Sequence, residues 1–425
     1  MSSRYRVEYH LKSHRKDELI EWIKGLLAVP FVLHSASADE SRVVIRQRYA
    51  DVFRAVEGMV QDEVDISLQQ GEFANGRVVR SRLHQLVPSI GPFFTPLPLE
   101  QAFLLEDKRR AISARTMVAP SFNDIRHVLN AAQILNMREA GNVKLVTFDG
   151  DVTLYEDGGS LTKSSKVVPY LLELLRRGIH VGIVTAAGYD EARKYMERMH
   201  GLMEALHTDT TITPEHKQNL AIMGGESNYL FRYDCVEQGL VAIDESHWLL
   251  PQMQQWASQD LTDTLDLAES LLHDFRASLR LPDEATIIRK PRAVGIVPGN
   301  RWNPETQRTI RVKMEREQLE EMVLTLQHTL ERFAPAARIQ FSCFDGGSDV
   351  WCDIGGKDLG VRALQHYFSP SSPIEPSETL HVGDQFAPMG SANDFKARLS
   401  GCTLWIASPQ ETIEVLHDLT HGFDH

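Results

Sequence analysis

Apolar residues recur at helical spacing through the first part of the chain. Two groups each fall on one face of a helix: Leu19, Ile20, Ile23, Leu26 and Leu27 in the first, and Ile125, Val128, Leu129, Ala132 and Leu135 in the second. Ser121 precedes the second group as a helix N-cap. Between the groups, prolines within residues 92–98 remove hydrogen bonds that a helix or a strand needs. The pattern predicts a helical N-terminal region over residues 1–140.

From about residue 141, short apolar runs alternate with amphipathic helices. Strands are expected at Lys144–Phe148 and His180–Thr185, with a helix from about Ser165 between them and a β-excursion over residues 224–243. Further strands at residues 339–344, 379–382 and 403–406 continue the alternation. This order is typical of a parallel sheet covered by helices. We therefore expect an α/β protein with a Rossmann-like core formed by residues 141–251 and 337–425.

Residues 252–336 interrupt the alternation. They contain an acidic helix, a basic strand-like segment at Thr286–Arg292, an apolar segment at Val294–Asn300 and a charged helix. A segment with both helices and strands between two parts of one sheet indicates an inserted domain. We expect an α+β cap here.

The composition of the chain excludes several classes of protein. The chain of 425 residues is 42% hydrophobic and 24% charged, as in soluble globular proteins, and its net charge of -13 disfavours general binding to nucleic acid. It contains no run of eighteen apolar residues and no apolar signal region at its start, so we expect no membrane segment and a cytoplasmic location. Its four cysteines lack metal-binding spacing and are expected to be reduced.

Two carboxylates follow the first expected core strand. Asp149 and Asp151 lie one residue apart in Phe148-Asp-Gly-Asp-Val-Thr153, so on an extended segment they face the same side. Open α/β sheets bind ligands at the carboxyl ends of their strands. We interpret Asp149 as a nucleophile and Asp151 as a general acid and base.

Three further residues complete a pattern that suits phosphoryl transfer. Thr185 ends the second expected strand, Lys357 follows two glycines, and Asp384 follows a later strand and precedes Asp394. A threonine hydroxyl and a lysine bind phosphoryl oxygens, and carboxylates hold Mg²⁺. The sequence predicts a Mg²⁺-assisted phosphatase and leaves the role of Asp394 open.

The order of these motifs resembles the haloacid dehalogenase superfamily, whose four motifs are matched by Asp149-x-Asp151-x-Thr153, Thr185, Lys357 and Asp384. An insertion between the second and third motifs is the arrangement called a C2 cap. Other segments are similar to phosphomannomutases. That likeness implies that Arg301 reaches the substrate from the cap and that Asp349 holds its hydroxyl groups.

A closer resemblance is to the IMP-specific 5'-nucleotidases of fungi and apicomplexans. The similar segments are Phe148–Gly158, Gly224–Phe231 and Asp349–Lys357. This resemblance covers nearly the whole chain. It implies Mg²⁺-dependent hydrolysis of inosine 5'-monophosphate (IMP) to inosine and phosphate through an aspartyl phosphate, a homotetramer, and activation by ATP at a separate site. Residues 1–140 would then serve regulation and oligomerisation.

The nucleotidase resemblance assigns roles by position. Asp149 and Asp151 form the catalytic pair, and with Asp384 they surround the metal. For the Asp151 side chain to carry a proton beside Mg²⁺, we expect Asp151 to meet the metal through its backbone carbonyl group. The implied substrate contacts are Asp151, Asp157, Thr185, Asp349 and Lys357, and the implied ATP contacts are Lys108 and His127.

Two alternatives remain open. A sugar-phosphate phosphatase or phosphomutase would use the same core, and a non-catalytic nucleotide-binding regulator could share the fold. The presence of both Asp149 and Asp151 counts against the regulator. Base selectivity depends on groups in the closed cap, which the sequence does not identify.

Overall fold

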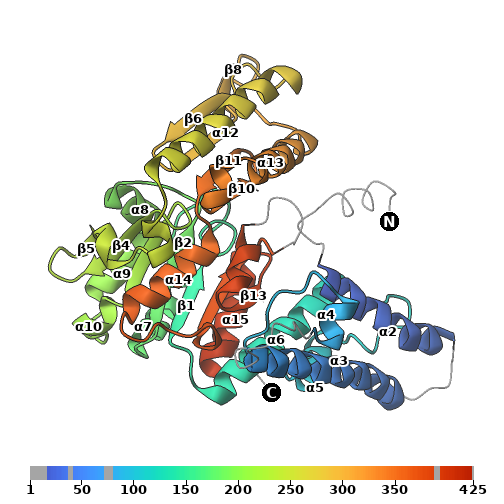
Figure 1. Ribbon diagram of the computed structural model, residues 1–425. Helices are drawn as coiled ribbons and strands as arrows, with labels where there is room; N and C mark the ends of the chain where they lie inside the picture. The colour runs from blue at the N-terminus through green and yellow to red at the C-terminus, as the bar shows by residue number, and fades with distance from the viewer. Residues whose placement is uncertain (1–16, 37–41, 71–79, 387–392, 424–425) are drawn as a thin grey trace.

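The computed structural model describes residues 17–36, 42–70, 80–386 and 393–423. It shows an N-terminal group of helices beside a core sheet, with a smaller α+β cap above the core (Figure 1). The expected α/β class is confirmed. The first sixteen residues of the expected N-terminal region lie outside the described residues.

The core sheet has seven strands in the order β13-β12-β1-β2-β3-β4-β5. The interior strand β1 pairs in parallel with β2 and β12, while β4 and β5 are antiparallel and form the expected β-excursion. Every residue of β1, β3 and β12 is buried, which explains why these strands are mostly apolar and do not alternate with exposed polar residues. The bounds are Leu145–Phe148 (β1), His180–Thr185 (β2), Leu220–Gly224 (β3), Tyr229–Asp234 (β4), Gly239–Ala242 (β5), Thr379–Gly383 (β12) and Cys402–Trp405 (β13).

Helices cover this sheet and connect its strands. Helices α7 and α14 pack on β2, and α15 packs against α7. The helices of the core are Val168–Arg176 (α7), Ala192–Arg198 (α8), His200–Thr208 (α9), Pro214–Lys217 (α10), Lys357–Phe368 (α14) and Pro409–His421 (α15), with 3-10 turns at Glu245–His247 (η2), Pro376–Glu378 (η4) and Asp394–Leu399 (η5).

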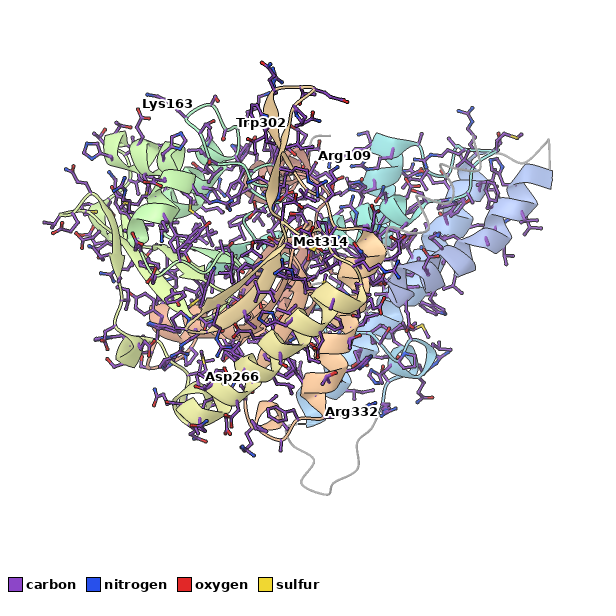
Figure 2. All side chains as sticks on the ribbon, turned by 90° about the horizontal axis from the view of Figure 1, so that it is seen from above. Arg109, Lys163, Asp266, Trp302, Met314 and Arg332 are labelled. Carbon is purple, nitrogen blue, oxygen red and sulfur yellow. The ribbon has the colours of Figure 1, made fainter. Side chains whose placement is uncertain are left out.

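The cap is built on a second sheet with the order β10-β11-β7-β6, and α12 and α13 pack on it. A separate hairpin, β8–β9, carries Trp302 and projects from the cap (Figure 2). The elements are Pro251–Gln254 (α11), Ser258–Ser278 (α12), Thr286–Lys290 (β6), Ala293–Val297 (β7), Asn300–Asn303 (β8), Arg308–Arg311 (β9), Arg316–Glu331 (α13), Ala336–Arg338 (η3), Phe341–Asp345 (β10) and Val350–Ile354 (β11).

One expected strand lies in a different sheet from the one proposed. The sequence analysis assigned residues 339–344 to the second part of the core, but β10 pairs with β11, and β11 pairs with β7 of the cap. The two strands form an antiparallel hairpin whose buried face packs on the cap helices. Sheet pairing therefore extends the cap to Ile354.

The N-terminal helices enclose an apolar core of their own. Helix α6 begins with a capping box between Ser121 and Asp124 and ends at Gly141 in the left-handed conformation. The N-terminal core also includes Phe386 and Trp405, so these helices pack directly on the edge of the core sheet. They are Glu18–Ala36 (α2), Arg42–Gln70 (α3), Arg82–Leu86 (α4), Leu99–Arg110 (α5) and Phe122–Ala140 (α6). In the described ranges, no helix is both long and apolar enough to cross a membrane.

Candidate active site

Three neighbouring parallel strands carry the predicted motifs to one edge of the core sheet. Asp149 directly follows β1, Thr185 ends β2, and Asp384 directly follows β12. These residues, together with Asp151, line a cleft of about 460 Å³. The expectation that the strand ends converge is therefore confirmed.

Lys357 lies at the centre of the charge arrangement. It begins α14, is fully buried, and places its Nζ atom 2.8 Å from Asp149 Oδ1 and 2.6 Å from Asp394 Oδ1. Burial opposes the charge on Lys357, but the two carboxylates raise its pKa. One ammonium group thus holds the predicted nucleophile and a second carboxylate together.

Asp394, whose role the sequence left open, anchors this arrangement. Its Oδ2 atom accepts hydrogen bonds from the backbone N–H groups of Asp384 (3.1 Å) and Gln385 (2.9 Å), and its Oδ1 atom lies 3.0 Å from His381 Nε2. A Cβ atom on Gly383 would approach Asp394 Oδ2 to 2.4 Å, so this close contact requires glycine. Asp394 therefore fixes both Lys357 and the backbone that carries Asp384.

Asp149, Asp384 and Asp394 form a group that fits a divalent cation. One oxygen from each lies within 4.8 Å of the others, and the buried Oδ1 atom of Asp384 has no hydrogen-bond partner. Burial raises the pKa of Asp149 to about 7, although Lys357 opposes the shift. Burial, followed by the charges of Asp394 and Asp149, also raises the pKa of Asp384. A cation bound here would relieve this repulsion.

The side chain of Asp151 lies outside this group of three carboxylates. Its Oδ2 atom accepts a hydrogen bond from Arg198 at 3.1 Å, and its Oδ1 atom accepts one from the backbone N–H of Gly158 at 2.9 Å. The next residue, Val152, has φ 61°, which is a strained conformation for a β-branched residue. The predicted nucleophile and acid/base therefore have separate environments, as different roles require.

The structure brings most of the predicted substrate contacts together. Asp157, Thr185 and Asp349 line the cleft, and Lys357 contacts Asp149 beneath it. Arg301 on β8 does not line the cleft, and its guanidinium group pairs with Glu284 instead.

Arginines that the sequence analysis did not select occupy the cleft. Arg198, at the end of α8, pairs with Asp151. Arg311, at the end of β9, has its Nη2 atom 3.8 Å from Asp349 Oδ2. Neither residue belongs to a local motif, so only the tertiary fold reveals them. Asp394 did carry a signal, because it follows the Gly383-Asp384 pair at a strand end.

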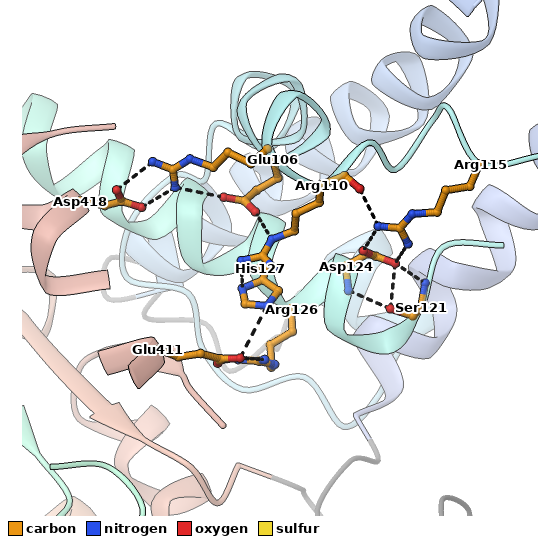
Figure 3. A network of polar contacts seen from close by, with 10 residues as sticks. Glu106, Arg110, Arg115, Ser121, Asp124, Arg126, His127, Glu411 and Asp418 are labelled. Atoms are coloured by element: carbon orange, nitrogen blue, oxygen red, sulfur yellow. Dashed lines mark hydrogen bonds and ion pairs between the residues drawn. The ribbon is translucent and has the colours of Figure 1, made fainter. Parts of the chain in front are cut away.

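The two residues predicted for ATP lie apart from the cleft, on adjacent helices. Lys108 is exposed in the last turn of α5, and His127 is largely buried on α6. Arg110 joins the helices, because its Nη2 atom lies 3.2 Å from His127 Nδ1 (Figure 3). Lys108 and His127 therefore lie on two helices that pack against each other.

Comparison with known proteins assigns the chain to a family. A model of the family described as IMP-specific 5'-nucleotidase matches residues 1–416. The chain belongs to the IMP-specific 5'-nucleotidase family. It is 61% identical to a relative named IMP-specific 5'-nucleotidase 1 from Saccharomyces cerevisiae and 57% identical to one from Candida glabrata, and each match covers 99% of this chain and at least 99% of the relative.

Solved structures agree with this membership of the nucleotidase family. An IMP-bound mutant of the Plasmodium falciparum IMP-nucleotidase has a TM-score of 0.78 and 30% identity, with 96% of each chain covered. The ATP-bound Plasmodium falciparum IMP-nucleotidase has a TM-score of 0.76 and 30% identity, covering 96% of this chain and 86% of the other. The fold shared with the Plasmodium falciparum IMP-nucleotidase therefore extends over nearly the entire chain.

Proposed function

We propose that this protein is a Mg²⁺-dependent, cytoplasmic 5'-nucleotidase that hydrolyses IMP to inosine and phosphate through an aspartyl phosphate. The observation that carries the proposal is the buried Asp149, 2.8 Å from Lys357, with a second carboxylate, Asp151, in the same cleft. Family membership supplies the substrate, and the cleft supplies groups suited to the reaction.

Asp149 attacks phosphorus in line and forms the aspartyl phosphate. Asp151 gives its proton to the departing 5'-oxygen, and Arg198, 3.1 Å from Asp151 Oδ2, stabilises the carboxylate that remains. That carboxylate then removes a proton from the water that hydrolyses the aspartyl phosphate. Lys357 stabilises negative charge on the phosphoryl oxygens in both steps.

Asp149 and Asp384 would hold Mg²⁺ with their side chains, and Asp151 with its backbone carbonyl group. Asp394 already accepts two backbone N–H groups and contacts Lys357, so it supports the site rather than completing it. Bound Mg²⁺ supplies positive charge that favours ionised Asp149 and offsets charge on the phosphoryl group.

We also propose that ATP binds near Lys108 and His127 and raises activity, and that the protein is a homotetramer, as the nucleotidase resemblance implies. Arg109, Arg110 and the neighbouring Arg115 already pair with carboxylates, whereas Lys108 is exposed. A triphosphate could therefore recruit Lys108 without first breaking an ion pair. Lys108→Ala should reduce activation by ATP and leave turnover without ATP intact, and light scattering should give the mass of four chains.

The deciding experiment measures phosphate release from IMP, GMP, AMP and mannose 6-phosphate, with and without Mg²⁺ and ATP. We expect the highest kcat/KM for IMP, loss of activity with EDTA, and recovery with Mg²⁺. A preference for mannose 6-phosphate would favour the sugar-phosphate phosphatase instead. No release from any ester would favour a non-catalytic regulator.

A further inference from the structure

The cleft contains a lysine that is not paired with a carboxylate. Arg198 and Arg311, which also line the cleft, form ion pairs with Asp151 and Asp349. Lys290, the last residue of β6 in the cap, has no carboxylate within ion-pair distance among the described residues. Its Nζ atom donates a hydrogen bond to the backbone carbonyl of Gly188 at 3.0 Å. An ammonium group has three N–H donors, so it retains capacity for a ligand.

Two aromatic rings flank this ammonium group. Lys290 Nζ lies 4.6 Å from the ring centroid of Trp351 in the cap and 5.8 Å from that of Tyr189 in the core, and both rings line the cleft. Burial lowers the pKa of Lys290, while the nearby Asp353 and Asp349 oppose the shift. The donor therefore lies in a partly apolar setting, where a hydrogen bond to a ligand is worth more than in water.

The position of Trp351 is fixed by a glycine. Trp351 on β11 pairs in register with Gly295 on β7. A Cβ atom added to Gly295 would come within 2.4–2.8 Å of three atoms of the indole, so the ring lies flat over the glycine backbone. Any larger residue at position 295 would displace the ring.

The loop that carries Tyr189 is also fixed. Its backbone N–H donates to the hydroxyl group of Tyr195 at 2.8 Å, and that hydroxyl group donates to the carbonyl of Ala187 at 2.6 Å. The Tyr189 and Tyr195 rings also contact each other, with centroids 5.2 Å apart. Both aromatic surfaces are therefore held in place before a ligand arrives.

We propose that Trp351 and Tyr189 receive the purine of the substrate and that Lys290 donates a hydrogen bond to the oxygen at position 6 of the base. This inference rests on the proposed nucleotidase function. Planar aromatic side chains stack on any base, so they supply affinity without selectivity. Lys290 supplies the selectivity, because IMP presents an acceptor at position 6, whereas AMP presents an amino donor that would face another donor.

Four variants test the assignment. Lys290→Met removes the donor, Lys290→Gln keeps an amide donor, and Trp351→Ala removes the aromatic surface. Arg289→Met is the matched control, because Arg289 is the adjacent cation on β6 but pairs with Asp266 and Glu269. For each variant, kcat/KM is measured with IMP, GMP and AMP, and inorganic phosphate is measured as a competitive inhibitor. Thermal unfolding checks that each variant is folded.

We expect Lys290→Met to lower the ratio of kcat/KM for IMP to that for AMP by at least about tenfold. GMP should lose activity along with IMP, because it has the same 6-oxo group, and the inhibition constant of phosphate should stay within about twofold of wild type. Lys290→Gln should give an intermediate ratio and serves in place of Lys290→Met if that variant does not fold. Trp351→Ala should lower kcat/KM for all three nucleotides. Arg289→Met should change neither the ratio of kcat/KM for IMP to that for AMP nor the inhibition constant of phosphate.

Other outcomes overturn the assignment. An unchanged ratio, or an equal loss with IMP and AMP, would mean that Lys290 only ties the cap to Gly188. A weaker inhibition by phosphate would mean that Lys290 binds the phosphoryl group. Failure of the wild-type protein to hydrolyse any purine nucleotide would reject the proposed function itself, and that result is visible before any variant is made.

Discussion

Two buried regions of this protein differ in how their carboxylates are paired with cations. At the junction of α5, α6 and α15, each carboxylate has its own arginine within 2.7 Å: Glu106 with Arg110, Asp124 with Arg115, Glu411 with Arg126, and Asp418 with Arg109 (Figure 3). In the cleft, Asp149 and Asp394 share the ammonium group of Lys357, and the Oδ1 atom of the neighbouring Asp384 has no hydrogen-bond partner. The junction is arranged for stability, and the cleft keeps unsatisfied charge for a ligand.

The largest expected effect concerns the cleft. Asp149→Asn should lower kcat by about 10³-fold or more, because an amide cannot act as the nucleophile. The fold should persist, since Lys357 keeps its contact with Asp394. Steady-state rates with saturating Mg²⁺ and thermal unfolding would be measured together. Retention of a tenth of the wild-type kcat by a folded variant would exclude the aspartyl-phosphate mechanism.

At the junction, the effect should fall on stability. Arg126→Met should lower the free energy of unfolding by about 2–4 kcal/mol, because Glu411 keeps its charge in a largely buried position without its partner. The matched control is Arg54→Met, which breaks the exposed pair with Glu100 and should lower the free energy of unfolding much less. Urea unfolding at pH 7.5 compares the two. Equal losses would show that the arginines of the junction carry no special stability.

The same contrast explains what the sequence could predict. The strand ends with Asp149, Thr185 and Asp384 were predictable, because apolar runs locate strands and parallel strands bring their carboxyl ends to one edge. The junction was not, because Arg126 and Glu411 are 285 residues apart and neither lies in a motif. Contacts between distant segments depend on packing rather than on periodicity.

The cap shows a related limit. A strand was expected at residues 339–344 and lies at Phe341–Asp345, but an apolar pattern does not identify the sheet that a strand joins. The same limit applies to Arg301 and Arg311, which lie near the same end of one hairpin, where Arg301 pairs with Ile310 and Arg311 pairs with Asn300. Only Arg311 reaches the cleft. The family resemblance pointed to Arg301 because of its sequence motif, whereas the tertiary structure places Arg311 in the cleft.

A third experiment asks whether the two regions are independent. Arg126 and Asn130 donate hydrogen bonds to the backbone carbonyl of Trp405 at 2.6 and 2.7 Å, and the Trp405 indole N–H donates to the carbonyl of Asp384 at 2.7 Å. Trp405→Phe removes the second link, so we expect Mg²⁺ to bind about fivefold more weakly, as the loss of one buried hydrogen bond implies.

Calorimetry of Mg²⁺ binding to the metal-free protein measures this effect without turnover. Trp248→Phe is the control, because the Trp248 indole also donates to a backbone carbonyl, that of Ile243 at 3.2 Å, and does not line the cleft. If both variants weaken Mg²⁺ binding equally, or if neither does, the hydrogen bond from Trp405 to Asp384 does not couple the junction to the metal site.

The smallest expected effect is the pH dependence of the junction. Burial, followed by the charges of Arg126 and Arg110, lowers the pKa of His127 to about 3, although the charge of Glu411 opposes the shift. The unfolded chain has a histidine pKa of about 6.5. The stability that neutral His127 contributes is therefore complete above pH 6.5 and is lost as the pH falls from there towards 3.

Between pH 7.5 and 5.5 we expect the free energy of unfolding to fall by an amount on the order of 1 kcal/mol, and His127→Gln should remove this pH dependence. Urea unfolding at both pH values measures it, and His328→Gln, on the exposed side of α13, is the control. The same pH dependence in wild type and His127→Gln would show that His127 is not buried as a neutral base in solution.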